Sequence, residues 1–147
     1  MNKKELQPAL DALKTIKMPK IESKELRAAL IRLHFALLGE YRKFTAGIED
    51  LRTVYLGAYQ DEIAEVAPLE AEMMNPATSQ ERRAELDKML RAHADLQEAA
   101  KTFNAECEKL ASEPVEIEKI DAESFLAEAA EQGLGLDILE SLYPILT

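Results

Sequence analysis

Two histidines and one cysteine are the side chains best suited to metal binding or nucleophilic chemistry in this chain. A carboxylate-bridged metal centre in a helical bundle needs a glutamate three residues before each metal-binding histidine. Leucine occupies that position before His93, and isoleucine occupies it before His34. The spacing therefore predicts no dedicated metal site.

Nucleophilic catalysis also lacks its usual sequence signals. Cys107 falls inside an expected helix, away from the positively charged helix starts that activate thiols. The chain has no Gly-x-Ser-x-Gly sequence, and Gly133-Leu134-Gly135 does not follow an expected strand as a nucleotide-binding loop would. We therefore expect no enzymatic activity, no catalytic residue, no cofactor and no small-molecule ligand.

The charge of the chain is unevenly distributed along its 147 residues. The formal net charge is -10, from 28 Asp and Glu against 18 Lys and Arg. Residues 1–56 have a net charge of +4, residues 57–79 hold five acids and no base, and residues 113–147 hold nine acids and one base. Such acidic segments are either a solubilising surface or a docking surface for a basic partner.

The C-terminal acids are the candidate docking surface for a protein partner, and we single out Glu116, Glu118, Glu123 and Glu128. In an alternative interpretation, the same region binds the basic N-terminal end of a neighbouring subunit. Nucleic-acid binding is not expected, because the total charge is acidic and no aromatic side chains are interleaved with the N-terminal lysines.

The composition is typical of a helical protein. Alanine (22 residues) and leucine (21 residues) are the commonest types, and there are only five glycines and six prolines. A single cysteine excludes a disulfide scaffold, and no apolar run is long enough to span a membrane. The basic residues at the start of the chain are not followed by the apolar run of a signal peptide, so we expect a cytoplasmic protein with no membrane partner.

The spacing of apolar residues predicts an all-α fold in a single domain, 1–147. The expected elements are a short helix at 5–16, a long helix at 20–60, a connector at 61–78, a second long helix at 79–112 and an acidic C-terminal region at 113–147. The two long helices predict a long antiparallel, coiled-coil-like helical hairpin. In the C-terminal region we expect an extended stretch and then a small helical segment. Its apolar side chains should fold back on the hairpin and leave the acids outward: Val115, Ile117, Ile120, Leu136, Ile138, Leu139 and Leu142.

The second long helix carries the strongest periodic signal. Its heptad stripe consists of Leu86, Met89, His93, Leu96, Ala100, Phe103, Cys107 and Leu110. We expect this stripe to face apolar residues of the first long helix between Leu26 and Tyr55. His93 is then a hydrogen-bonded core histidine, or alternatively a pH-sensitive residue that sets the register of the two helices.

The opposite face of the first long helix carries small residues and one aromatic. Phe35, Gly39, Ala46 and Gly57 cluster there at helical spacing. Glycine inside a helix costs about 1 kcal/mol, so its presence indicates close packing against another helix. We expect that neighbour to be another helix of this chain or, in the preferred version, a second subunit.

The order of these elements resembles a family of small uncharacterised helical proteins of bacteriophages and prophages. The resemblance is most specific over residues 103–120, from Phe103-Asn104-Ala105-Glu106 to Ile120, and extends to Gly135-Leu136-Asp137-Ile138-Leu139. It implies a phage or prophage gene acting in the cytoplasm of the bacterial host, and it supplies no functional residues.

We therefore expect a phage-encoded protein-binding or assembly factor without enzymatic activity. The alternatives are a structural subunit of a phage particle and a small enzyme whose site forms at a subunit interface. An enzyme should show a polar pocket with converging titratable groups, whereas a binding protein should show an open apolar groove.

Overall fold

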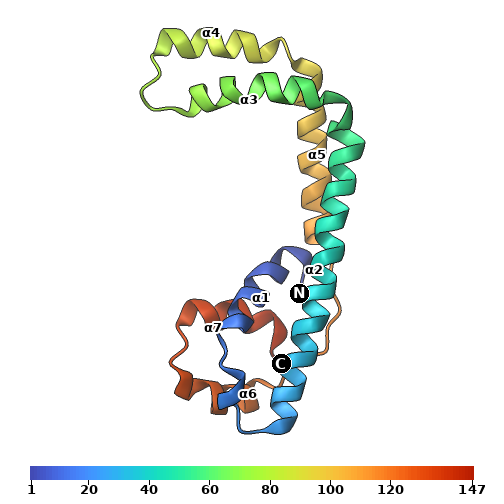
Figure 1. Cartoon of the computed structure of the whole chain (residues 1–147), viewed down its shortest axis with the longest axis vertical. Coiled ribbons are helices and arrows are strands. Elements are labelled where there is room, and N and C mark those ends of the chain that lie inside the picture. Colours follow the sequence, from blue (N-terminus) through green and yellow to red (C-terminus); the bar gives the residue numbers. More distant parts are fainter. The chain divides into compact units, whose positions relative to one another are not determined.

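The computed structural model describes all residues from 1 to 147, and it confirms the all-α class. Seven α-helices are joined by short turns (Figure 1): α1 (Leu6–Thr15), α2 (Lys24–Leu56), α3 (Gln60–Met74), α4 (Gln80–Arg91), α5 (Ala94–Ser112), α6 (Ala122–Ala129) and α7 (Leu136–Leu142). None of the helices is both long and apolar enough to cross a membrane.

The chain divides into two compact units, whereas the sequence analysis treats it as one domain. The first unit consists of Met1–Ala46 and Lys109–Thr147, and the second consists of Gly47–Glu108. Their apolar side chains form two separate clusters. The periodicity of a helix shows which face is apolar but not which other element covers that face, so it does not reveal such a division.

The first unit has an extensive hydrophobic core. Its central residues are Leu6, Leu10 and Leu13 of α1, Leu26, Leu30, Leu33 and Leu37 of α2, and Phe125, Ala129, Leu142 and Ile145 of the C-terminal region. The leucines of each helix recur every three or four residues, so they share one face. The part of α2 between Leu26 and Leu37 is therefore covered by α1 and the C-terminal region, whereas the heptad stripe was expected to cover it.

The segment between α5 and α6 is extended, as expected, and backbone hydrogen bonds join it to both chain termini. The Val115 N–H donates to the Met1 carbonyl at 2.9 Å, and the Thr147 N–H donates to the Ile120 carbonyl at 2.9 Å. These are isolated bridges and not strands of a sheet. They bring Val115 and Ile120 into the core, where 7% and 5% of their surfaces are exposed.

The expected connector of the second unit is largely a helix. α3 continues through Pro68 and ends just before Asn75-Pro76. Proline removes one backbone donor inside a helix and leaves the carbonyl four residues earlier without its partner. Both Ala64 and Pro68 are exposed, so water can satisfy that carbonyl. α3 and α4 lie side by side and antiparallel (Figure 1).

The expected helix over 79–112 is interrupted by a turn at Ala92 and His93, which separates α4 from α5. The turn changes which side chains point inward. Leu96 is buried, but Met89 of the expected stripe is 44% exposed, and its neighbour Leu90 packs inward in its place. The heptad stripe is therefore not a single continuous seam.

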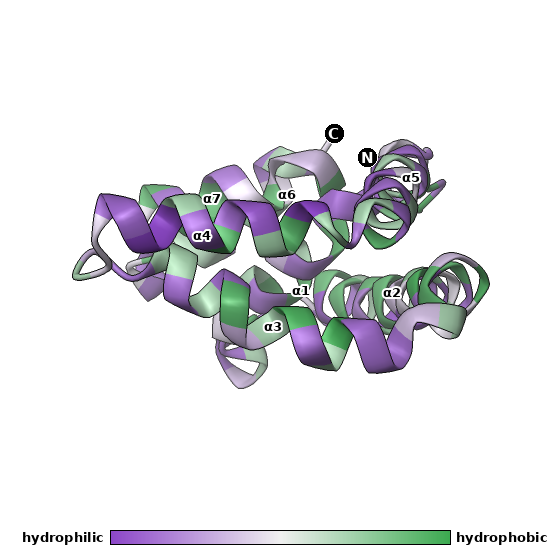
Figure 2. Cartoon of the chain, turned by 90° about the horizontal axis from the view of Figure 1, so that it is seen from above, coloured by the Kyte–Doolittle hydropathy of each residue, from purple (hydrophilic) through white to green (hydrophobic).

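The second unit has a small hydrophobic cluster. Leu56, Val66 and Leu96 are its buried members, and the Arg52 guanidinium lies 5.4 Å from the ring centre of Phe103. Many residues of α4 are hydrophilic, as the colouring of the ribbon in Figure 2 shows. With so few buried side chains, this unit depends more on local contacts within and between neighbouring helices than the first unit does.

Candidate protein-docking surface

An open apolar groove lies between the end of α1 and the exposed side of α2, within the first unit. Its volume is about 350 Å³, and its lining consists of Leu13, Lys14, Ile16, Met18, Ile31, His34 and Phe35. Leu13 and Ile16 are buried at its floor, where they also belong to the hydrophobic core. The groove is therefore held in place by the best-packed part of the molecule.

Two large apolar side chains of this groove face solvent. Phe35 is 67% exposed and Ile31 is 42% exposed. They lie one helical turn apart on α2, whereas Leu30, Leu33 and Leu37 occupy the side that faces the core. The ring of His34 meets that of Phe35 edge to face, with ring centres 6.0 Å apart. This contact orients Phe35 in the wall of the groove.

A lysine stands at the edge of the groove. Lys14 pairs with Asp11 at 2.9 Å, and Gln7 donates to the other oxygen of the same carboxylate at 2.6 Å. Hydrogen bonds from Gln7 and then from Lys14 lower the pKa of the Asp11 carboxyl below its ordinary value. Lys14 thus stands at the rim of an apolar groove as one member of an exposed ion pair.

The predicted helix-contact residues are not packed against another helix at the positions of the two glycines. A side-chain carbon at Gly39 would meet nothing within 4 Å, and Ala46 is exposed. Gly57 lies in the turn after α2, with the Thr53 methyl as the nearest atom at 3.9 Å. Phe35 lines the groove. Contact of these residues with a second subunit stays a prediction.

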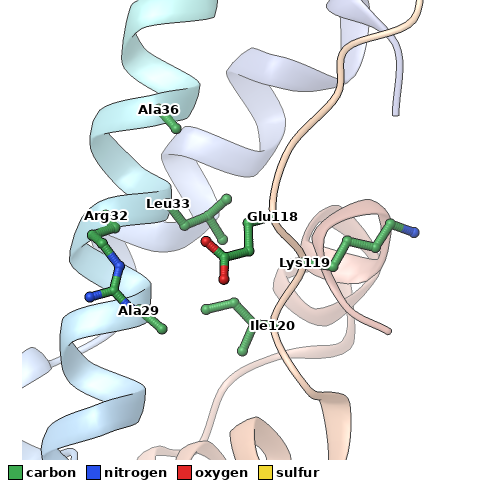
Figure 3. A pocket seen from close by; sticks show the side chains of 7 residues that line it. All are labelled: Ala29, Arg32, Leu33, Ala36, Glu118, Lys119 and Ile120. Atoms are coloured by element: carbon green, nitrogen blue, oxygen red, sulfur yellow. The ribbon is translucent and has the colours of Figure 1, made fainter.

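The four predicted docking acids differ in their surroundings. Glu116, Glu118 and Glu123 are exposed. The Glu118 side chain points toward α2 at a small pocket of about 130 Å³, while its neighbour Lys119 points away (Figure 3). That volume is well below the range of about 300–1,000 Å³ usual for small-molecule sites.

Glu128 has a structural contact that the sequence analysis did not anticipate. Its carboxylate accepts hydrogen bonds from the backbone N–H groups of Glu22 at 2.6 Å and Ser23 at 3.0 Å. The Ser23 hydroxyl in turn accepts from the Leu26 N–H at 3.1 Å, which caps the start of α2. Glu128 therefore fastens α6 to the start of α2 rather than facing outward with the other acids.

His93 has a specific partner in the second unit. Its Nδ1 lies 3.1 Å from a carboxylate oxygen of Glu62 in α3. The expected hydrogen bond is therefore present, although the imidazole is only partly buried, at the turn between α4 and α5. Glu62 precedes His93 by 31 residues, so sequence spacing offered no way to find the pair.

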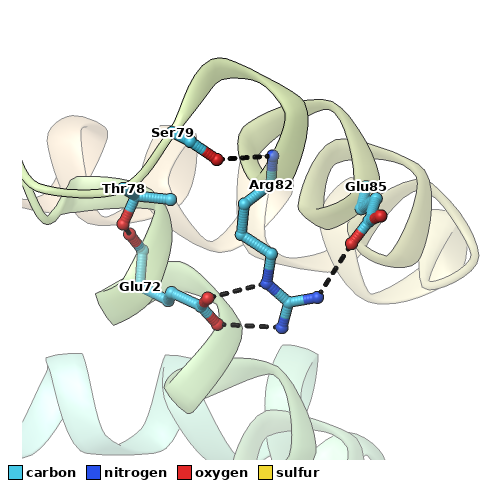
Figure 4. Close-up of polar contacts among 5 residues, drawn as sticks. All are labelled: Glu72, Thr78, Ser79, Arg82 and Glu85. Atoms are coloured by element: carbon cyan, nitrogen blue, oxygen red, sulfur yellow. Dashed lines mark hydrogen bonds and ion pairs between the residues drawn. The ribbon is translucent and has the colours of Figure 1, made fainter.

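The turn between α3 and α4 is fixed by a set of polar contacts (Figure 4). Arg82 pairs with both oxygens of Glu72, at 2.7 Å and 3.1 Å, and with Glu85 at 3.1 Å. Hydrogen bonds from Arg82 lower the pKa of the Glu72 carboxyl. The Thr78 hydroxyl donates to the Glu72 carbonyl, and Ser79 caps α4 by accepting from the Arg82 N–H. These contacts hold the end of α3, the turn and the start of α4 together.

The exposed side of α7 is a second apolar surface of the first unit. Leu136, the first residue of α7, is 78% exposed, and Tyr143, which directly follows α7, is 79% exposed. The exposed acid Glu140 lies between them in the sequence. Leu136 was expected to fold back on the core, and this prediction was wrong. Leu142 is fully buried as expected, and the seven-residue helix is too short for its pattern to indicate which side is covered.

Comparison of the chain with protein-family models, curated proteins and solved structures gives no match.

Proposed function

We propose that this protein is a protein-binding or assembly factor without enzymatic activity, encoded by a bacteriophage or prophage and acting in the host cytoplasm. The observation that supports the binding role is the open groove with Phe35 and Ile31 exposed in its wall. The phage context rests on the resemblance of residues 103–120 and of the C-terminal segment.

The groove has the physical features of a protein-binding site. Aromatic side chains dominate the energetics of interfaces, because they bury a large apolar area at a small entropic cost. Burial of apolar surface releases about 25 cal/mol per Å². The floor formed by Leu13 and Ile16 belongs to a packed core, so a partner would meet a surface that is already formed.

Electrostatic attraction of a basic partner is a second part of the proposed binding role. It is favoured by the exposed acids Glu116, Glu118 and Glu123. Exposed charges steer association and make it sensitive to salt, and they add little affinity of their own. On this proposal, their neutralisation slows binding of a basic partner, whereas truncation of Phe35 weakens binding at every salt concentration.

A photo-crosslinking amino acid at position 35, in the cell that produces the protein, tests the proposal. We expect covalent adducts with a defined protein, identified by mass spectrometry. The matched control is position 54, because Val54 is 73% exposed on the same helix but lies outside the groove. The absence of any adduct at position 35, or equal adducts at both positions, would contradict the proposal.

A further inference from the structure

The two segments that form the first unit have opposite charges. Residues 1–46 hold ten Lys and Arg against five Asp and Glu, whereas residues 109–147 hold nine Asp and Glu against two Lys. Each segment also supplies one of the exposed apolar surfaces. The groove belongs to the basic segment, and the exposed face of α7 belongs to the acidic segment.

The exposed face of α7 has the pattern of a helix that binds in a groove. Leu136 and Glu140 lie one turn apart on α7, and Tyr143 follows directly after the end of α7 with helical backbone angles (φ -49°, ψ -42°). Their spacing of i, i+4 and i+7 therefore forms one ridge. Leu136 and Tyr143 lie about 10 Å apart along the axis, from a rise of 1.5 Å per residue. The ridge thus presents an acid between two large apolar side chains, and Asp137 is exposed beside it.

The groove offers the complementary arrangement. Ile31 and Phe35 provide an apolar wall on α2, and Met18 lines it from the neighbouring turn. Lys14 stands at the rim, where its exposed ammonium pairs with Asp11 and has further donors for a second carboxylate. An inserted helix with an acid between two apolar residues would bury the apolar pair and bring its acid to the lysine. Complementary charge at the rim of an apolar contact fixes orientation and partner choice.

The ridge cannot bind in the groove of its own chain unless α7 leaves the hydrophobic core. The opposite side of α7 is committed to that core: Leu142 is fully buried, Ile138 and Leu139 pack against the same cluster, and α7 lies against α1. The ridge therefore points away from the core on which its own groove is built. An occupant must come from another molecule.

We propose that this occupant is a second copy of the chain, whose Leu136–Glu140–Tyr143 ridge docks in the groove formed by Lys14, Ile31 and Phe35. The inference rests on the proposed function and specifies its partner. The two surfaces are different, so the contact is heterologous, and a pair of copies keeps one free groove and one free ridge. Such a contact builds a ring or an open chain of subunits. Because only a single short helix enters the groove, the interface should be small and reversible.

Sedimentation analysis of two variants that each lose one surface tests the proposal. We expect the wild-type protein to form species that grow with concentration, whereas Phe35→Asp and Tyr143→Asp are each monomeric. An equimolar mixture of the two variants should form a dimer and nothing larger, because only one intact groove and one intact ridge can meet. Val54→Asp is the matched control for an exposed apolar side chain, and it should behave as wild type.

Charge reversal tests the register of the contact. We expect Lys14→Glu or Glu140→Lys alone to weaken association by about tenfold, and the double variant Lys14→Glu/Glu140→Lys to recover most of it. Circular dichroism of each variant checks that its helices are intact. Absence of recovery in a folded double variant would overturn the Lys14–Glu140 register.

The remaining outcomes separate this inference from the proposed function. If the wild-type protein is monomeric at its highest soluble concentration, self-assembly is overturned, and a crosslink from position 35 to a foreign protein would still support the binding role. If the variant mixture fails to dimerise while the wild type assembles, another surface joins the copies. If neither self-association nor an adduct with a foreign protein involves the groove, the proposed binding role and the proposed self-assembly are both wrong.

Discussion

The two units of this protein are stabilised in different ways. In the first unit, seventeen buried apolar residues from distant parts of the chain form one core. In the second, the hydrophobic cluster has three buried members, and polar contacts at the ends of its helices add to it: Glu62 with His93, and Arg82 with Glu72 and Glu85. One unit relies on non-local burial, and the other relies more on helix pairs and their connecting turns.

This difference indicates which unit should open less readily and which unit should carry the binding surfaces. Local opening of a protein concentrates where few apolar contacts are buried, so amides of the second unit should exchange with solvent more readily than those of the first. Both surfaces proposed for docking lie on the first unit. They are therefore presented on the more rigid part of the chain, which limits the entropy that binding must overcome.

The largest effect is expected from truncation in the first core. Phe125 is 1% exposed, and Phe125→Ala should lower the free energy of unfolding by about 3–5 kcal/mol, because it removes buried area and leaves a cavity. Hydrogen exchange should show lost protection mainly in residues 1–46 and 109–147. An equal loss across residues 47–108 would mean that the two units unfold as one and would break the comparison.

The matching change in the second unit should have a smaller effect. Leu96 is 7% exposed in a small cluster, so Leu96→Ala should cost about 2–3 kcal/mol, at the low end for buried leucines, because the cluster can relax. Thermal denaturation gives the free energy, and hydrogen exchange should place the loss within residues 47–108. If Leu96→Ala lowered the free energy of unfolding more than Phe125→Ala does, the second core would contribute more to stability than the first, contrary to our expectation.

Loss of the Glu128 contact should be smaller again. Glu128→Ala leaves the Ser23 N–H without its carboxylate partner, and the loss of a capping interaction costs about 1 kcal/mol. Urea denaturation measures the effect, and Glu123→Ala is the control, because Glu123 is an exposed acid on the same helix. Equal effects of the two substitutions would show that the Glu128 contact contributes nothing to stability.

The smallest effect is a pH dependence in the second unit. Hydrogen bonds from Arg82 lower the pKa of Glu72 below 4.5, so the folded state binds this proton less readily than the unfolded state. The resulting stabilisation is complete above pH 4.5 and is lost as the pH falls through the folded pKa. The protection of the α3–α4 turn amides, taken as the ratio of the intrinsic to the observed exchange rate, should fall over this range in the wild-type protein and change less in Glu72→Gln. The same loss of protection in both proteins would assign it to other groups.

Sequence reasoning predicted local features well when neighbouring residues determined them. The short first helix, the long helix expected at 20–60 and the extended stretch before α6 all depend on residues close together in the chain. The prediction failed at the connector, 61–78, most of which is helix α3 with Pro68 inside it. An exposed proline is compatible with a helix whose freed carbonyl meets water, and the sequence does not show that exposure.

The candidate site was less accessible to such reasoning. Phe35 was singled out by its position opposite the apolar seam, and the groove beside it depends on α1, which precedes it by about twenty residues. Glu128 was grouped with outward acids, yet its partners Glu22 and Ser23 lie more than a hundred residues earlier in the chain. Charge and spacing along a helix are local properties, whereas a groove or a cap between distant segments is not.

By itself, the sequence determined the helical class, the apolar face of α2 from Leu26 to Leu37 and the opposite charges of the two ends, because each depends on residue type and short-range spacing. Only the tertiary structure decided that the apolar residues divide into two clusters, that α7 buries Leu142 and exposes Leu136, and that Ile31 and Phe35 form the wall of a groove. The physical reason is that a side chain becomes buried only when another surface packs against it. The sequence of a helix sets its own pattern of apolar residues, but the packing of the whole chain decides which element covers that pattern.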